Sequence, residues 1–264
     1  MVSHSGLVTV MTRAARKAAP RLRRDFGEVE QLQVSRKGPA DFVSMADERA
    51  EQTIVEELRH ARPDWGLYLE EGGIIEGDPT KPRWIVDPVD GTSNFLHGIP
   101  HFAISIAVQE AKPGGQGWGE ISHGLIYQPL TDESFWAEKG RGAWLHDRRL
   151  RVSARRHLDE SLIGTGMPHF GRGNVANWSR IYGAIGPEVS GIRRMGSAAL
   201  DFAWVAAGGD PGEIERRRSE ASDSGDLRGD FVEDLLEAVE MAMALIGHAG
   251  GDQGVRKVPA RRDP

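Results

Sequence analysis

The sequence predicts a layered α/β or α+β architecture, folded as one compact unit of two lobes. The chain opens with apolar residues at helical spacing, and short apolar strands follow. Its 264 residues, 39% of them hydrophobic, are enough for one large core or two smaller ones. A mixture of helices and strands without an internal repeat is typical of stacked helical and sheet layers.

The first predicted element is an amphipathic helix between residues 7 and 26. Pro20 lies inside it, and because an internal proline costs about 3 kcal/mol, the helix should kink or divide into two segments. Its exposed side is basic, which would allow contact with RNA or a partner protein, although such a face is more often simply solvated. The basic residues are Arg13, Arg16, Lys17, Arg21, Arg23 and Arg24.

A second helix and a series of strands are expected next. The stretch from Asp47 to Arg59 carries its apolar residues on one stripe. Two short strands then end in acidic residues, the first at Glu70 and Glu71 and the second at Asp87. Further strands are predicted at residues 102–108, 121–127, 134–137 and 143–145.

We place the N-terminal lobe at residues 1–150 and the C-terminal lobe at 151–248, followed by a disordered tail at 249–264. The second lobe contains a glycine-rich loop at 162–166, the stretch 189–195 and a helix at 197–207. Residues 208–230 contain too few apolar side chains to offset their ordering entropy and are predicted to be flexible. A helix should resume at Asp230, where Glu233 completes a capping box, and end near Gly247.

The most informative stretch is Asp87-Pro-Val-Asp90-Gly-Thr-Ser93. A buried strand delivers Asp87 at its end, and Asp90 returns toward the same point after the Pro88 turn. Two hard oxygen ligands that converge in this way suit Mg²⁺. Residues 91–93 would open a short helix whose backbone N–H groups face an anion. The alternative is that Asp87 and Asp90 only cap a turn, since Asp-Pro and Asp-Gly are ordinary turn dipeptides.

These residues resemble the inositol monophosphatase family of Mg²⁺-dependent, lithium-sensitive phosphatases. The resemblance rests on the upstream Glu70-Glu71, the block from Asp87 to Ser93, and Gly196-Ser-Ala-Ala-Leu-Asp201, and it extends to about Gly209. It implies a layered α-β-α-β-α sandwich of the sugar phosphatase type, which is usually dimeric.

Carried over position by position, the resemblance implies a metal site and a substrate site. Glu70, Asp87, the Val89 carbonyl and Asp90 would hold Mg²⁺. Asp47 would pair with the Thr92 hydroxyl to orient or deprotonate the attacking water. The catalytic residues would be Asp47, Glu70 and Thr92, and the phosphate and substrate residues would be Gly91, Thr92, Ser93, Gly196, Ser197 and Ala198.

The family carries one further metal-binding aspartate, in a W-D-x-A-A-G block that this sequence lacks. An ungapped count places Ala238 at that position, and neither Asp234 nor Glu237 replaces the carboxylate convincingly. Asp223, Asp226 or Asp230 could instead approach from the preceding segment. Either a frameshift or true divergence after residue 209 would explain the loss. We therefore expect a weakened phosphatase.

The predicted reaction is hydrolysis of a small phosphorylated alcohol, with myo-inositol 1-phosphate as the first candidate. Histidinol phosphate and 3′-phosphonucleotides are alternative substrates. The absence of cysteine excludes cysteine-dependent phosphatase chemistry. A non-catalytic regulator that binds RNA or the transcription machinery through the basic first helix is the rival interpretation. The net charge of −6 gives no global attraction to nucleic acid. We expect a cytoplasmic location, because neither a signal peptide nor a membrane span is recognisable.

Overall fold

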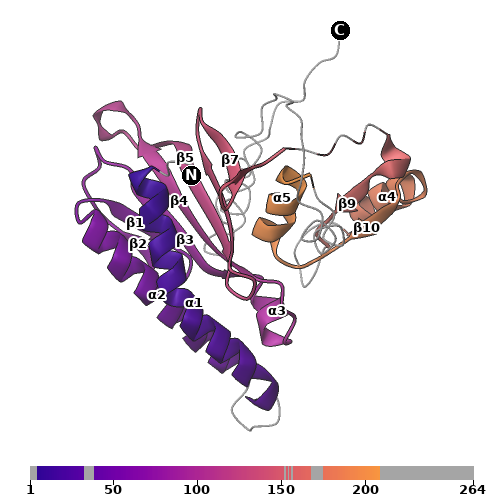
Figure 1. Cartoon of the computed structure of the whole chain (residues 1–264), viewed down its shortest axis with the longest axis horizontal. Coiled ribbons are helices and arrows are strands. Elements are labelled where there is room, and N and C mark those ends of the chain that lie inside the picture. Colours follow the sequence, from indigo (N-terminus) through magenta and orange to yellow (C-terminus); the bar gives the residue numbers. More distant parts are fainter. Residues whose placement is uncertain are drawn as a thin grey trace.

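The computed structural model describes residues 5–32, 39–151, 153, 155, 157–167 and 175–208. These residues form five layers (Figure 1): helices α1 and α2, a large sheet, helix α5, a two-stranded sheet, and helix α4. The expected α-β-α-β-α sandwich of the inositol monophosphatase type is therefore confirmed in its layer order.

The large sheet has eight strands in the order β2-β1-β3-β4-β5-β6-β7-β8. Only β1 and β3 run parallel to each other, and the other neighbouring pairs are antiparallel. The strand bounds are β1 Gly66–Leu69, β2 Gly73–Ile75, β3 Arg83–Asp90, β4 Ala103–Ala111, β5 Trp118–Gln128, β6 Glu133–Glu138, β7 Gly142–Leu145 and β8 Arg148–Arg149. Each strand predicted from the sequence is present within a few residues of its expected position.

Two long helices, α1 (Gly6–Leu32) and α2 (Pro39–Ala61), lie side by side across one face of the sheet (Figure 1). The expectation that Pro20 divides the first helix into two segments is wrong, since α1 is continuous through it. Pro20 lies on the exposed side of α1. Proline has no N–H group to donate to the Arg16 carbonyl oxygen, but on the exposed side water can donate to it instead. The cost of a proline inside the helix is therefore reduced.

Strand alternation gives the sheet two apolar faces and the protein two cores. Trp84, Val86 and Ile106 belong to the core beneath α1 and α2, whereas Ile85 and Ala107 belong to the core beneath α5. Helix α5 (Ala198–Ala206) is fixed to the second face partly by Trp204, whose ring meets that of Phe135 edge to face at 4.9 Å. The sheet is thus covered by helices on both sides.

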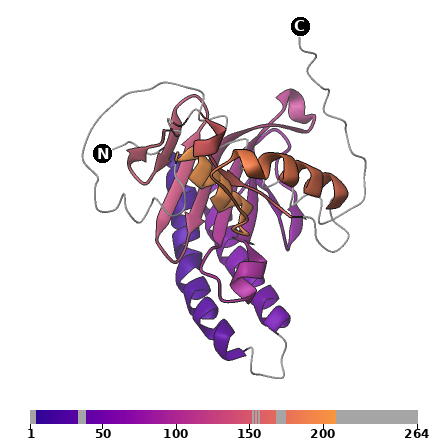
Figure 2. The ribbon, with the colours of Figure 1, turned by 90° about the vertical axis from the view of Figure 1, so that its right-hand side faces the viewer.

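The C-terminal layers consist of the parallel pair β9 (Leu162–Gly164) and β10 (Gly191–Arg193) and helix α4 (Val175–Ile185), which Figures 1 and 2 place on the outer side of the pair. The sequence did not predict α4. Its large apolar residues Val175, Ile181, Tyr182 and Ile185 are exposed. Val175, Trp178, Tyr182 and Ile185 recur at helical spacing, so the sequence did carry a periodic signal for this helix.

The flexible segment predicted at 208–230, the helix predicted to begin at Asp230 and the tail at 249–264 lie, apart from Gly208, outside the described residues. The lobe boundary at residue 150 coincides with the end of the large sheet at Arg149 and remains a prediction. Within the described ranges, no helix is long and apolar enough to cross a membrane.

Candidate active site

The parallel pairing of β1 and β3 brings two acidic strand ends together. Leu69 pairs with Val86, so the next residues, Glu70 and Asp87, are neighbours at the point where the pairing of β1 with β3 ends. The sequence suggested that β3 ends at Asp87 and turns at Pro88. Instead β3 continues to Asp90, and a register shift against β4 falls between Asp87 and Asp90. This bulge, rather than a turn, redirects the strand between the two carboxylates.

The Glu70 and Asp87 carboxyl groups lie close enough to influence each other's ionisation. Burial, followed by the nearby charges of Asp90 and Glu70, raises the pKa of Asp87 well above its usual range. Its Oδ1 also accepts the Val89 N–H at 3.0 Å, which fixes the side chain.

Helix α2 supplies Asp47 to the same acidic cluster. Its side chain is buried, and its Oδ1 has no hydrogen-bond partner among the described residues. Burial and the surrounding carboxyl groups raise the pKa of Asp47 to about 8. A buried acceptor without a donor is costly unless a ligand, a cation or water meets it. Asp47 therefore has an unused acceptor oxygen beside the cluster.

The predicted phosphate residues follow directly on Asp90. Gly91 has a φ of 99°, and a Cβ there would lie 3.0 Å from the His101 carbonyl oxygen and 3.2 Å from the Ser197 Cβ, so only glycine fits. Thr92 and Ser93 begin helix α3 (Thr92–Leu96) and are exposed to solvent. The Thr92 hydroxyl donates to the Val89 carbonyl oxygen at 3.1 Å, not to Asp47 as the resemblance implies.

The segment before α5 also reaches the site. Asp90 Oδ2 accepts the Ser197 hydroxyl at 2.5 Å and the Ala199 N–H at 2.8 Å, and thus caps α5. The predicted substrate residues Gly196, Ser197 and Ala198 therefore lie against the predicted metal and phosphate residues. Residues more than 100 positions apart in the chain meet here.

Asn94 joins the same two parts of the site and was not singled out by sequence analysis. Its amide nitrogen donates to the carbonyl oxygens of His101 and Met195, at 2.7 and 2.8 Å. The φ of Gly196 is 97°, and a Cβ there would lie 2.7 Å from the Asn94 amide. The side chain of Asn94 is therefore enclosed between α3 and the segment that leads into α5.

The carboxyl cluster has the chemistry of a divalent cation site. Burial, and after it the charges of neighbouring carboxyl groups, raises the pKa values of Glu70, Asp87 and Asp47, and Asp47 Oδ1 has no hydrogen-bond partner among the described residues. In the described part of the chain, no three acidic or histidine side chains are grouped as a ready-made metal site. Asp90 is engaged with the segment that leads into α5. Binding of a cation would therefore require these side chains to reorient and to be deprotonated.

The chain is similar in sequence and in fold to known proteins. A sequence model of the inositol monophosphatase family matches residues 4–211. The inositol-1-monophosphatase of Rhizobium meliloti (strain 1021) is 54% identical over 215 residues, covering 81% of this chain and 78% of the relative. The Nus factor SuhB of Pseudomonas aeruginosa is 41% identical over 76% of this chain and 73% of that protein. The crystal structure of extragenic suppressor protein SuhB from Bartonella henselae superposes with a TM-score of 0.68 at 52% identity, covering 77% of this chain and 76% of that chain.

The layered fold and these relatives place the chain in the class of phosphoric monoester hydrolases. Within that class, the chain belongs to the inositol monophosphatase family.

Proposed function

We propose that this protein is a Mg²⁺-dependent phosphomonoesterase and that myo-inositol 1-phosphate is its first candidate substrate. The observation that carries the proposal is the convergence of Asp47, Glu70, Asp87 and Asp90 beside Thr92, from α2 and from the ends of two adjacent strands. The relative from Rhizobium meliloti bears the name inositol-1-monophosphatase, which supports the choice of substrate.

In the proposed site, Glu70, Asp87, the Val89 carbonyl and Asp90 hold Mg²⁺. When bound, the cation lowers the pKa of water and neutralises charge on a phosphoryl group. Gly91, Thr92 and Ser93 hold the phosphate, and the open Asp47 oxygen accepts a proton from the attacking water, directly or through the Thr92 hydroxyl. The segment Gly196-Ser197-Ala198 lines the side on which the alcohol leaves.

The single test is phosphate release from a panel of myo-inositol 1-phosphate, histidinol phosphate and a 3′-phosphonucleotide. Release that rises with Mg²⁺ is expected, with the inositol ester hydrolysed fastest. Asp90→Asn should abolish most of it, because the change removes a cation ligand. Preference for another ester in the panel would correct the substrate and keep the reaction, and release unaffected by both Mg²⁺ and Asp90→Asn would refute the proposal.

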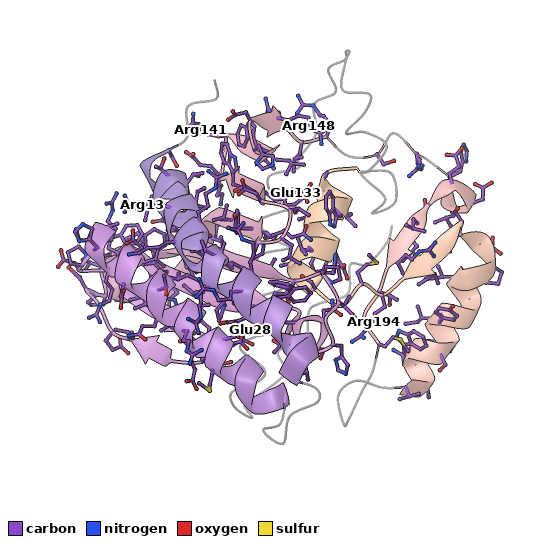
Figure 3. The ribbon with its side chains drawn as sticks, turned by 60° about the horizontal axis from the view of Figure 1, so that its bottom comes forward. Arg13, Glu28, Glu133, Arg141, Arg148 and Arg194 are labelled. Atoms are coloured by element: carbon purple, nitrogen blue, oxygen red, sulfur yellow. The ribbon has the colours of Figure 1, made fainter. Side chains whose placement is uncertain are left out.

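A regulatory role is the second candidate, since several relatives bear the name Nus factor SuhB. The basic side of α1, on which this role would depend, is partly offset within the chain, because three carboxylates pair with four of its six cations. Arg13 (labelled in Figure 3) and Lys17 both pair with Glu57, at 3.0 and 2.6 Å, and Arg21 pairs with Asp25 at 3.0 Å. The remaining pairs are Arg16 with Asp132 and Arg23 with the Pro129 carbonyl oxygen. This pairing reduces the positive charge that the face can offer to RNA.

RNA binding provides the discriminating measurement for this second role. Contact through the basic face would produce an affinity that falls steeply with salt, because each neutralised phosphate releases counterions. Joint replacement of Arg21, Arg23 and Arg24 by Gln should then weaken binding. We expect weak binding that the triple replacement leaves unchanged. We also propose, from the family alone, a homodimer in the cytoplasm.

A further inference from the structure

A second buried carboxylate of α2, Glu51, lies one helical turn after Asp47 and contacts the strand end that carries Glu70. Its side chain is only 6% exposed. Oε2 accepts the Glu71 N–H at 3.0 Å, and Oε1 accepts the Gly72 N–H at 2.8 Å. We propose that Glu51 is a positioning residue that holds the Glu70 turn in place and thereby sets the affinity of the site for a divalent cation. The inference rests on the site of the proposed function.

Glu51 completes the hydrogen bonding of the turn between β1 and β2. The Glu70 N–H donates to the Val86 carbonyl oxygen at 3.2 Å, which ties Glu70 to β3. Strand β1 ends at Leu69 and β2 begins at Gly73, so the N–H groups of Glu71 and Gly72 lie between the strands and have no strand partner. Glu51 accepts both of them. The backbone of Glu70 is thus fixed by β3 on one side and by α2 on the other.

The geometry requires a carboxylate at position 51. Two N–H groups point at one side chain, and only a carboxylate offers an acceptor oxygen to each. A glutamine would present one oxygen and one NH₂ group, so one of the backbone donors would face another donor. Burial raises the pKa of Glu51, while the hydrogen bonds from Glu71 and Gly72 oppose that rise and favour the ionised form.

Gly72 shows that the turn and Glu51 are fitted closely to each other. A Cβ at position 72 would lie 2.8 Å from Glu51 Oε1 and 3.0 Å from Leu69 Cδ1. Any side chain there would therefore displace the Glu51 carboxylate. The same contact can be disturbed from α2, by changing Glu51, or from the turn, by changing Gly72.

A residue that only stabilises the helix or the turn would lower the stability of the protein without a specific effect on cation binding. A positioning residue for Glu70 has a second effect. Once the turn is loosened, Glu70 must be ordered again when the cation binds, so the affinity falls even in folded protein. Outer residues that orient metal ligands typically change metal affinity about 10 to 100-fold.

The experiment is calorimetric titration of the full chain with Mg²⁺ in the absence of substrate. Glu51→Gln should raise the Kd for Mg²⁺ about 10-fold or more. The matched control is Glu57→Gln on the same helix, which removes a carboxylate that pairs with Arg13 and Lys17 away from the site. Its Kd should stay at the wild-type value. An unchanged Kd in Glu51→Gln would overturn the inference.

Should Glu51→Gln fail to fold, Gly72→Ala tests the same contact with Glu51 intact, and it should raise the Kd for Mg²⁺ in the same direction. Gly27→Ala is its control, because a Cβ at Gly27 meets no atom within 4 Å. A wild-type Kd in Gly72→Ala would likewise overturn the inference.

Phosphate release measured in parallel separates this inference from the proposed function. Weaker Mg²⁺ binding in Glu51→Gln, with no phosphate release even from the wild type, would refute the function and support the positioning role. Release by the wild type with an unchanged Kd in the variant would do the reverse. Failure of the wild type to bind Mg²⁺ would refute both.

Discussion

Asp47 and its neighbours show how single residues of this site act on stability as well as on chemistry. Burial contributes most to the raised pKa of Asp47, and the charges of Glu71, Glu70, Glu51 and Glu48 add to it. In the absence of a divalent cation, Asp47 of the folded protein therefore keeps its proton up to about pH 8, whereas Asp47 of the unfolded chain loses it near its ordinary pKa of 3.8. Linkage between protonation and folding makes the stability of the metal-free protein depend on pH.

For Asp47 the pKa rises from 3.8 to about 8 on folding, so its contribution to stability is fully present below about pH 4 and is lost as the pH rises through about 8. The thermal midpoint in a chelator should consequently be lower at pH 8 than at pH 5. Asp47→Asn removes the titrating group and should shrink this difference. Each unit of difference between the folded and unfolded pKa changes the free energy of unfolding by about 1.4 kcal/mol. In a chain of this size, that corresponds to about 3 °C in the thermal midpoint.

The wild type and Asp47→Asn share every other titratable group, so the difference between their changes in thermal midpoint isolates the contribution of Asp47. An Asp47→Asn protein whose midpoint changes between pH 5 and pH 8 as much as that of the wild type would contradict the assignment of the raised pKa to Asp47.

At the scale of elements, the site is formed by the contact between α3 and the start of α5 as well as by the ends of strands. Asp90 caps α5 through Ser197 and Ala199, and Asn94 bonds to carbonyl oxygens on both sides of this contact. His101 adds a contact with Asp201 of α5, at 3.2 Å. The distance between the phosphate residues and the substrate segment is thus set by a few buried polar contacts.

Asn94→Ala should destabilise the protein by about 1 to 3 kcal/mol, because two partly buried carbonyl oxygens lose their donor. It should also raise the KM more than it lowers kcat, since the loosened segment lines the alcohol side. Urea unfolding and initial-rate kinetics measure the two effects. Asn177→Ala on the exposed side of α4 is the control, with an expected change within about 0.5 kcal/mol. Equal effects of the two replacements would contradict this role of Asn94.

The elements also differ in how far the sequence could predict them. Continuous apolar runs predicted β3 and β4, because each of these strands is buried on both faces of the sheet. The bulge in β3 was taken for a turn, since proline and glycine mark both. Glu51 was missed because its partners lie about 20 positions away, at a turn. The available signal was two acids, Asp47 and Glu51, on the buried stripe that continues with Ile54.

At the scale of the whole molecule, the described residues hold all the predicted site residues but not the family's remaining metal aspartate. The family match covers residues 4–211, and the expected position of that aspartate falls beyond it. The described pieces of the site come from distant parts of the sequence: residues 47–90 supply the carboxyl cluster, and residues 196–199 supply Ser197 and its neighbours. Cation affinity should therefore be the property that the altered C-terminal sequence weakens.

We expect turnover at least about 10-fold below that of the Rhizobium meliloti relative, when both are assayed side by side at the same Mg²⁺ concentration, because the family resemblance implies one charged ligand that this sequence lacks in its usual block. Raising the Mg²⁺ concentration should narrow the gap. Full activity of this protein at submillimolar Mg²⁺ would show that the missing aspartate is dispensable.

The central claim is that the carboxyl cluster, which lies where the pairing of β1 with β3 ends, is a cation-dependent phosphatase site. Its most direct test is phosphate release from myo-inositol 1-phosphate, measured against Mg²⁺ concentration for the wild type and for Asp87→Asn. The account predicts release that saturates with Mg²⁺ in the wild type and is lost in the variant. Release that persists in a chelator, or that Asp87→Asn leaves intact, would contradict it.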